Sequence, residues 1–198
     1  MKMTNNIRTR RSVRSFKFDE IPKNIIDELL VSAMCAPSPK NKQPWEFAVC
    51  TGETKLKIVE AFKNKILKDL SKRPENIALQ MSMETVHIMQ VAPVLILVYY
   101  DGIYIEEYSD DSENWALISP QAECCDIQSI GAAIQNLLLE AHSRKISSLW
   151  VCDILYAYDE ISKIIDNNKT FIAGVILGYA KEEPVMPKRN FNKIRWFQ

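Results

Sequence analysis

The sequence predicts an α+β fold, in which a mixed, mostly antiparallel central sheet is surrounded by helices. Segments with strand character and segments with helical spacing are interspersed along the chain, without the regular strand–helix alternation of a parallel α/β protein. The 198 residues suit one domain, and a content of 47% apolar and 25% charged residues is ordinary for a globular protein. We therefore expect a single domain over residues 1–198.

The first predicted helix begins at Pro22, since proline suits a first helical turn, where its missing N–H costs nothing. Apolar residues then recur at helical spacing up to Met34, and Pro37 and Pro39 end the helix. A loop runs from there to Pro44.

Three elements are expected next. Residues 45–50 alternate like a strand, and the apolar residues of 56–70 follow the spacing of an amphipathic helix. The more polar stretch 72–89 is expected to be helical as well. In the second half we expect a buried strand at 94–100, a surface loop or short helix at 101–114, a helix at 120–143, a strand at 146–151, a helix at 154–165 and a strand at 170–178.

The helix expected at 120–143 is apolar on several faces, with Ser119 as its cap and Pro120 in its first turn. A helix of this character is buried in a core or against a partner. Gly131 within it costs about 1 kcal/mol relative to alanine, which indicates close packing at that point.

Charge and cysteine content exclude several classes of function. The 25 basic and 25 acidic residues balance, which argues against a nucleic-acid binder. The longest apolar run, 91–100, is too short for a bilayer span, and residues 1–11 lack a secretory signal, so we expect a cytoplasmic protein with no membrane partner. Five cysteines without a CxxC pair and only two histidines predict no metal site. We expect reduced, mostly buried thiols, with a redox role for the adjacent Cys124 and Cys125 as the alternative.

Two polar segments carry the candidate chemistry. Arg10, Arg11, Ser12 and Arg14 are suited to binding a phosphate, because guanidinium groups donate paired hydrogen bonds and keep their charge. Lys188 and Arg189 form a second basic pair near the other end of the chain, and we expect the two ends of the fold to meet at one phosphate. The alternative for Arg10–Arg14 is a solvated basic turn.

The second segment, residues 36–45, combines amide and hydroxyl side chains with three prolines. A stiff polar loop presents fixed donors and acceptors to a heteroaromatic ring at little entropic cost. The alternative is an ordinary connector between a helix and a strand.

Together these segments resemble the nitroreductase family of flavin enzymes. The family has an R-[RH]-S-x-[RK] signature followed by P-S-x-x-N-x-Q-P-W, which here are residues 10–14 and 37–45. The resemblance extends over nearly the whole chain through a central helix at 131–142, Trp150 in a strand, Leu177-Gly178-Tyr179, and the basic tail Pro187-Lys188-Arg189.

The resemblance implies a non-covalent FMN in each of two sites of an intertwined homodimer. Residues 10–14 would hold the phosphate, ribityl chain and pyrimidine edge, and Arg189 with Lys188 would close on the phosphate. The family often carries a Gly-x-Gly turn before the Trp strand; here Ser147 and Ser148 stand in its place. The flavin would be reached from the other subunit by the loop residues Pro37, Ser38, Pro39, Asn41 and Gln43. The apolar tail 180–198 is expected to reach onto the partner subunit.

The implied activity is transfer of hydride from NADH or NADPH, through FMN, to a nitroaromatic, quinone or similar electron-poor acceptor by a ping-pong mechanism. The absence of a GxGxxG motif fits such an enzyme, in which donor and acceptor take turns at one flavin face. No acid or base side chain is assigned; His142 is interpreted as structural, and His87 is left without a role. Two alternatives stay open: other chemistry of the superfamily (dehalogenation, flavin fragmentation or ring dehydrogenation), and a non-catalytic flavin-binding or redox-sensing protein.

Overall fold

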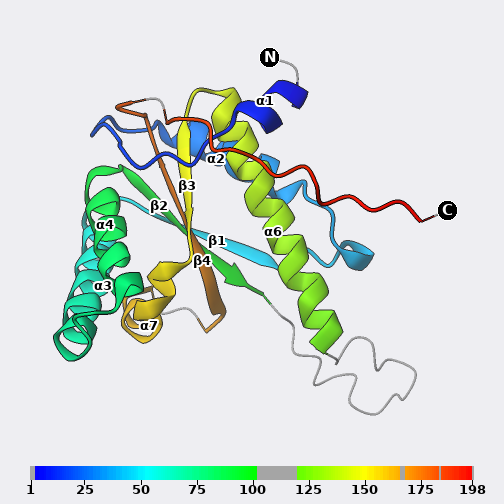
Figure 1. Cartoon of the computed structure of the whole chain (residues 1–198). Helices are drawn as coiled ribbons and strands as arrows, with labels where there is room; N and C mark the ends of the chain where they lie inside the picture. Colours follow the sequence, from blue (N-terminus) through cyan, green and yellow to red (C-terminus); the bar gives the residue numbers. More distant parts are fainter. Residues whose placement is uncertain (1–2, 102–119, 166–167, 183, 198) are drawn as a thin grey trace, which may run out of the picture.

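The computed structural model describes residues 3–101, 120–165, 168–182 and 184–197. Its centre is one sheet of four strands: β1 (Trp45–Cys50), β2 (Val94–Tyr100), β3 (Ser147–Val151) and β4 (Thr170–Gly178). They lie in the order β1-β2-β4-β3, and every neighbouring pair is antiparallel (Figure 1). The predicted α+β class is therefore confirmed. Within the described residues, the one parallel pairing is an isolated bridge between Ser12 and Ser148.

Helices cover both faces of this sheet (Figure 1). The helices α2 (Lys23–Met34) and α6 (Pro120–Ser143) pack on one face. The other face is covered by α3 (Gly52–Lys72), α4 (Ile77–Val91) and α7 (Tyr158–Ile165). Short helices complete the described structure: α1 (Met3–Thr9) and the 3-10 turns η1 (Pro39–Asn41) and η4 (Asp153–Ala157).

Strand β2 shows why the sheet needs two covering layers. Leu95, Leu97 and Tyr99 contribute to the core beneath α3 and α4. The alternate residues Val94, Ile96 and Val98 contribute to the core beneath α2 and α6. Successive side chains of a strand point to opposite faces, so a strand that is apolar at every position must be covered on both. This confirms the prediction of a fully buried strand.

The remaining elements follow the expected order with shifted boundaries. Pro22 is the cap before α2 rather than its first helical residue, since its ψ of 137° is extended. The expected helices at 56–70 and 72–89 are separated where the chain leaves helical geometry at Arg73, and Asn76 caps α4 by accepting from the Leu79 N–H at 3.2 Å. Helix α1 was not predicted, and the expected helix 154–165 begins with the 3-10 turn η4. The prediction for 101–114 and the Ser119 cap lie outside the described residues.

Two sequence-based expectations about packing were wrong. Of the five cysteines, all of which are described, only Cys50 is buried; Cys35, Cys124, Cys125 and Cys152 are exposed. They lie at a helix end, on the outer part of α6 and after β3, where the core does not reach. At Gly131, an added Cβ would meet the Trp150 ring at 3.8 Å, an ordinary contact. The close approaches occur instead at Gly174 and Gly178.

Candidate functional site

The basic segment after α1 is fixed against the edge of the sheet. The Val13 N–H donates to the Ser148 carbonyl at 3.0 Å, and Ser12 pairs with Ser148 in the parallel bridge. Val13 itself is buried in the core. Because successive side chains of an extended segment point in opposite directions, the burial of Val13 turns Ser12 and Arg14 away from the core. The arginines are thus held at the start of β3 by backbone pairing.

A cavity of about 750 Å³ opens beside this segment. It is bounded by the end of α1, the end of α6, the start of β3, the exit of β4 and the first part of the tail. Its charged side chains are five cations and one carboxylate: Arg10, Arg11, Lys17, Lys145, Lys181 and Glu182. Ser147 and Ser148 also line it. This excess of positive charge favours an anionic ligand.

Arg10 is partly buried and lies beside other cations. Burial is the main factor that lowers the pKa of Arg10, followed by the positive charges of Arg189 and Arg11. Arg11 donates back to the carbonyls of Arg8 and Arg10, at 2.8 and 2.7 Å. Arg189 from the tail is thus within electrostatic reach of Arg10. A phosphate between them would relieve repulsion that the protein alone leaves uncompensated.

His142 belongs to this cavity, although sequence reasoning treated it as structural. The Thr9 hydroxyl, which donates to the Asn5 carbonyl at 2.7 Å, lies within hydrogen-bond distance of the His142 Nε2 atom, at 2.8 Å. Burial lowers the pKa of His142, as do the charges of Arg10 and Arg11. A lone histidine at the end of an apolar helix gives no sequence signal that it will line a cavity. Only the packing of α1 against α6 reveals it.

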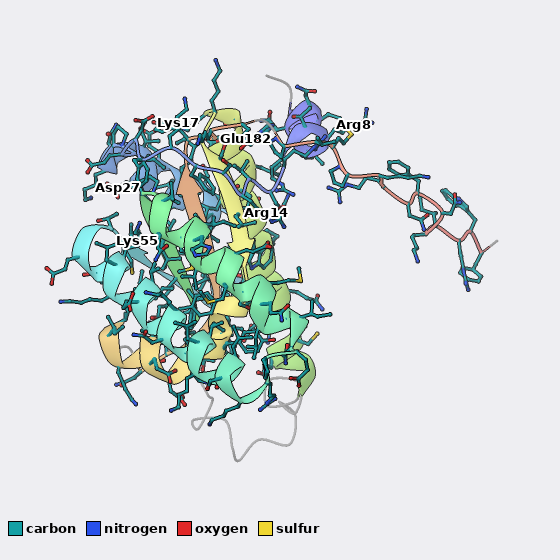
Figure 2. All side chains as sticks on the ribbon, turned by 60° about the vertical axis from the view of Figure 1, so that its left-hand side comes forward. Arg8, Arg14, Lys17, Asp27, Lys55 and Glu182 are labelled. Carbon is teal, nitrogen blue, oxygen red and sulfur yellow. The ribbon has the colours of Figure 1, made fainter. Side chains whose placement is uncertain are left out.

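The other predicted residues of the arginine and tail segments lie outside this cavity. Arg14 lines a second cavity of about 730 Å³, together with His87 and part of α4. Lys188 is exposed on the tail and lines neither cavity. Pro184 and Met186 of the tail lie over the chain's own first cavity. The end of the tail extends away from the body of the chain (Figures 1 and 2).

The loop that contains Pro37, Ser38, Pro39, Asn41 and Gln43 lines neither cavity of its own chain. Its backbone is strained, because Lys40, Asn41 and Gln43 all have positive φ, of 52°, 56° and 50°. The Ser38 hydroxyl accepts from the Gln43 N–H at 2.9 Å and holds the loop in this shape. Strain in several non-glycine residues is typical of functional loops.

Lys42 anchors this loop to the long helix. Its ammonium group donates to the Asp126 carboxylate of α6, which also accepts from the Tyr100 hydroxyl at 2.8 Å. The Asp126 side chain is only 4% exposed. The loop, the end of β2 and α6 therefore meet at one buried charge, which fixes the place of the loop relative to the sheet.

The family of the chain follows from its similarity to known proteins. A model of the nitroreductase family matches residues 7–179. The chain belongs to the nitroreductase family. Within the described part of this family member, no group of three or more His, Cys, Asp or Glu side chains is placed to hold a metal ion. No helix there is long and apolar enough to cross a bilayer.

Named relatives carry more than one activity. YfhC of Bacillus subtilis (strain 168), provisionally named an NAD(P)H nitroreductase, is 28% identical over 92% of this chain and 87% of its own length. An iodotyrosine deiodinase of Haliscomenobacter hydrossis is 26% identical, over 90% of this chain and 79% of its own.

Solved structures share the fold over the whole chain. A BluB-like flavoprotein from Clostridium difficile 630 has a TM-score of 0.80 at 26% identity and covers 100% of this chain and 99% of its own. The FMN-dependent nitroreductase NfnB from Mycobacterium smegmatis, solved in complex with NADPH, has a TM-score of 0.73 at 18% identity, over 98% and 97%. The second likeness concerns the fold alone.

Proposed function

We propose that this member of the nitroreductase family is an FMN-dependent oxidoreductase that passes hydride from NADH or NADPH to nitroaromatic, quinone or similar electron-poor acceptors in the cytoplasm. The observation that carries the proposal is that Arg10 and Arg11 line the first cavity and that Arg189, from the opposite end of the chain, lies within electrostatic reach of Arg10. The flavoprotein and nitroreductase relatives support it.

The residues present fit FMN. Arg10, Arg11 and Arg189 supply uncompensated positive charge for a phosphate, and Lys188 adds to it from the tail. Ser12 and Ser148 lie beside them through the backbone bridge, and Ser147 lines the same cavity. Arg14 lies two residues after Ser12 and forms no ion pair with the described residues. It would face the pyrimidine edge of the flavin. When bound, FMN supplies the redox chemistry; the chain's residues bind and orient it.

A homodimer completes the site in this proposal. Pro37, Ser38, Pro39, Asn41 and Gln43 would contact the flavin of the other subunit, which is consistent with their distance from the cavity of their own chain. The tail supports the same assembly. Phe191, Ile194, Trp196 and Phe197 are all at least 74% exposed in the single chain. Such aromatic and aliphatic side chains favour burial against a second copy.

FMN retention tests the cofactor assignment. Arg10→Gln should weaken FMN binding about 10- to 100-fold, since it removes a charge-assisted bond of about 1.5–3 kcal/mol. Arg8→Gln, at an exposed position that lines neither cavity, is the matched control and should bind FMN normally. Fluorescence titration of FMN into the flavin-free protein measures both. Equal affinities in the two variants would contradict the phosphate assignment.

Spectroscopy tests the activity itself. The purified yellow protein should be bleached by NADH or NADPH under anaerobic conditions and reoxidised by a nitroaromatic or a quinone. A flavin that stays oxidised with both donors would favour a flavin-binding or redox-sensing protein instead.

Sedimentation tests the assembly. Deletion of residues 191–198 should weaken dimerisation. A truncated chain that still sediments as a dimer at micromolar concentration would refute the role given to the tail.

Reductive dehalogenation is the second candidate, and the deiodinase relative favours it. Release of iodide from an iodinated phenol by the reduced protein, faster than nitroaromatic reduction, would replace the first proposal by the second.

A further inference from the structure

The second cavity carries an inference that rests on the proposed function. We propose that it binds the adenosine diphosphate half of the nicotinamide dinucleotide donor, with Lys17 and Lys181 on the phosphates and Phe18 against the adenine. The cavity lies between the segment after the arginine cluster and the end of α4. It is distinct from the place assigned to the FMN phosphate, because Arg10 and Arg11 do not line it, and it adjoins the place proposed for the flavin ring, because Arg14 lines it.

A short ladder outside the main sheet places the two lysines. The Lys17 N–H donates to the Tyr179 carbonyl at 2.8 Å, and the Lys181 N–H donates to the Ser15 carbonyl at 2.9 Å. Phe16 and Ala180 are the bridged pair between these bonds. Phe16 is 4% exposed and belongs to the core, so the ladder has one face turned inward.

The opposite face of the ladder must then carry both lysines. Side chains alternate along each strand, so Lys17 and Lys181 share the face away from Phe16 and are diagonal neighbours, typically about 7–8 Å apart. Both residues line the first cavity and also the second. The two ammonium groups therefore stand at the boundary between the proposed FMN phosphate site and its neighbour.

Neither lysine is paired with a carboxylate in the part of the chain that the structure describes. Among the described residues, no ion pair involves Lys17 or Lys181, although Glu182 and Asp19 line the cavities that they share. Figure 2 shows Lys17 and Glu182 at the same end of the molecule, with Arg14 further along this side. Two adjacent cations without a partner favour a ligand with more than one negative charge, such as a diphosphate.

The rest of the second cavity suits an aromatic group. Its apolar lining comes from Phe16, Phe18, Ile88 and Val91. Phe18 is 78% exposed, a large aromatic side chain that the protein leaves uncovered beside the lysines. An adenine ring stacks well on such a surface. Diphosphate and adenine are joined in the electron donor that the proposed function requires, which is why we assign this half of the donor to the cavity.

The test compares donors with and without the adenosine half. In the FMN-loaded Lys17→Gln/Lys181→Gln double variant, the KM for NADH or NADPH should rise about tenfold or more, since two charge-assisted bonds are lost. Reduced nicotinamide riboside carries neither the phosphates nor the adenosine, so its rate of flavin reduction per bound FMN should not change. The matched control is Lys68→Gln/Lys72→Gln, an exposed lysine pair on α3 that lines neither cavity.

Calorimetry gives a second readout that does not depend on turnover. ADP titrated into the FMN-loaded wild type should bind more tightly than inorganic phosphate or adenosine, and the lysine double variant should weaken ADP about tenfold. Phe18→Ala should weaken ADP and adenosine but leave phosphate unchanged. Unaltered ADP binding in the lysine variant, or equal effects on both donors, would overturn the inference. A wild type that binds ADP through the lysines but is reduced by neither donor would refute the proposed function alone.

Discussion

The substitution Asp126→Asn tests how the strained loop is held. The Asp126 carboxylate in α6 accepts from the Lys42 ammonium of the loop and, at 2.8 Å, from the Tyr100 hydroxyl of β2. Asparagine keeps the size of the side chain and one acceptor oxygen but removes the negative charge. The Lys42 side chain, 23% exposed, would then lie at the edge of the core without its counterion.

The expected loss of stability follows from the burial of the two partners. Removing one partner of a fully buried ion pair costs about 3–5 kcal/mol. A single charge-assisted hydrogen bond contributes about 1.5–3 kcal/mol. Because Asp126 is buried but Lys42 keeps some contact with water, and because Tyr100 can still donate to the amide oxygen, we expect a loss of about 2 kcal/mol. For a chain of this size this lowers Tm by about 4–8 °C.

Urea unfolding of the flavin-free protein measures this loss. Asp69→Asn is the matched control, because Asp69 pairs with Lys65 on one helix with both side chains at least 25% exposed. That surface pair should contribute much less to stability than the buried one. A double-mutant cycle with Lys42→Met should give a coupling energy of about 1 kcal/mol or more. A loss in Asp126→Asn no larger than in the control, or additive effects of the two substitutions, would refute the account of the anchor.

Three further predictions concern the backbone and the first cavity. Lys145, in the turn that follows α6, is in the left-handed conformation, with a φ of 61°. Lys145→Gly should therefore raise the free energy of unfolding by about 0.5–1 kcal/mol in urea; a lower stability would contradict the strain assigned to this position. Burial and the neighbouring arginines lower the pKa of His142, so the unfolded chain binds the proton more tightly and the flavin-free protein should lose stability as the pH falls below about 6.5. His142→Gln should remove that part of the loss, and identical pH profiles of wild type and variant would exclude it. A Cβ at Gly178 would lie 2.7 Å from Phe16, so Gly178→Ala should destabilise the fold by about 1–3 kcal/mol; an unchanged Tm would show that Phe16 can move freely.

Much of the fold could be predicted because buried strands and helices show local patterns of apolar residues in the sequence. Residues 94–100 are apolar at every position, and the structure covers both faces of that strand. The long helix ends at Ser143 as expected, and all four expected strands are present. Helix α1 was missed because its seven residues carry little apolar periodicity. The cysteines were misjudged because composition does not say which side of a helix faces the core.

The candidate site divides in the same way. Sequence motifs named Arg10, Arg11, Ser147 and Ser148, and these residues line one cavity. No local pattern pointed to His142 or to the anchor at Asp126, since each is defined by a partner more than 80 positions away.

By itself, the sequence determined the class of fold, the order of its elements and the residue types suited to a phosphate, because hydrophobic periodicity and side-chain chemistry are local properties. The tertiary structure alone decided which of these residues meet. The pairing of residues 15–17 with 179–181 and the packing of α1 on α6 bring both ends of the chain to one cavity. Each of these contacts joins segments that are far apart in the sequence and meet only after the sheet and its covering helices have formed. No single segment of the chain therefore contains that information.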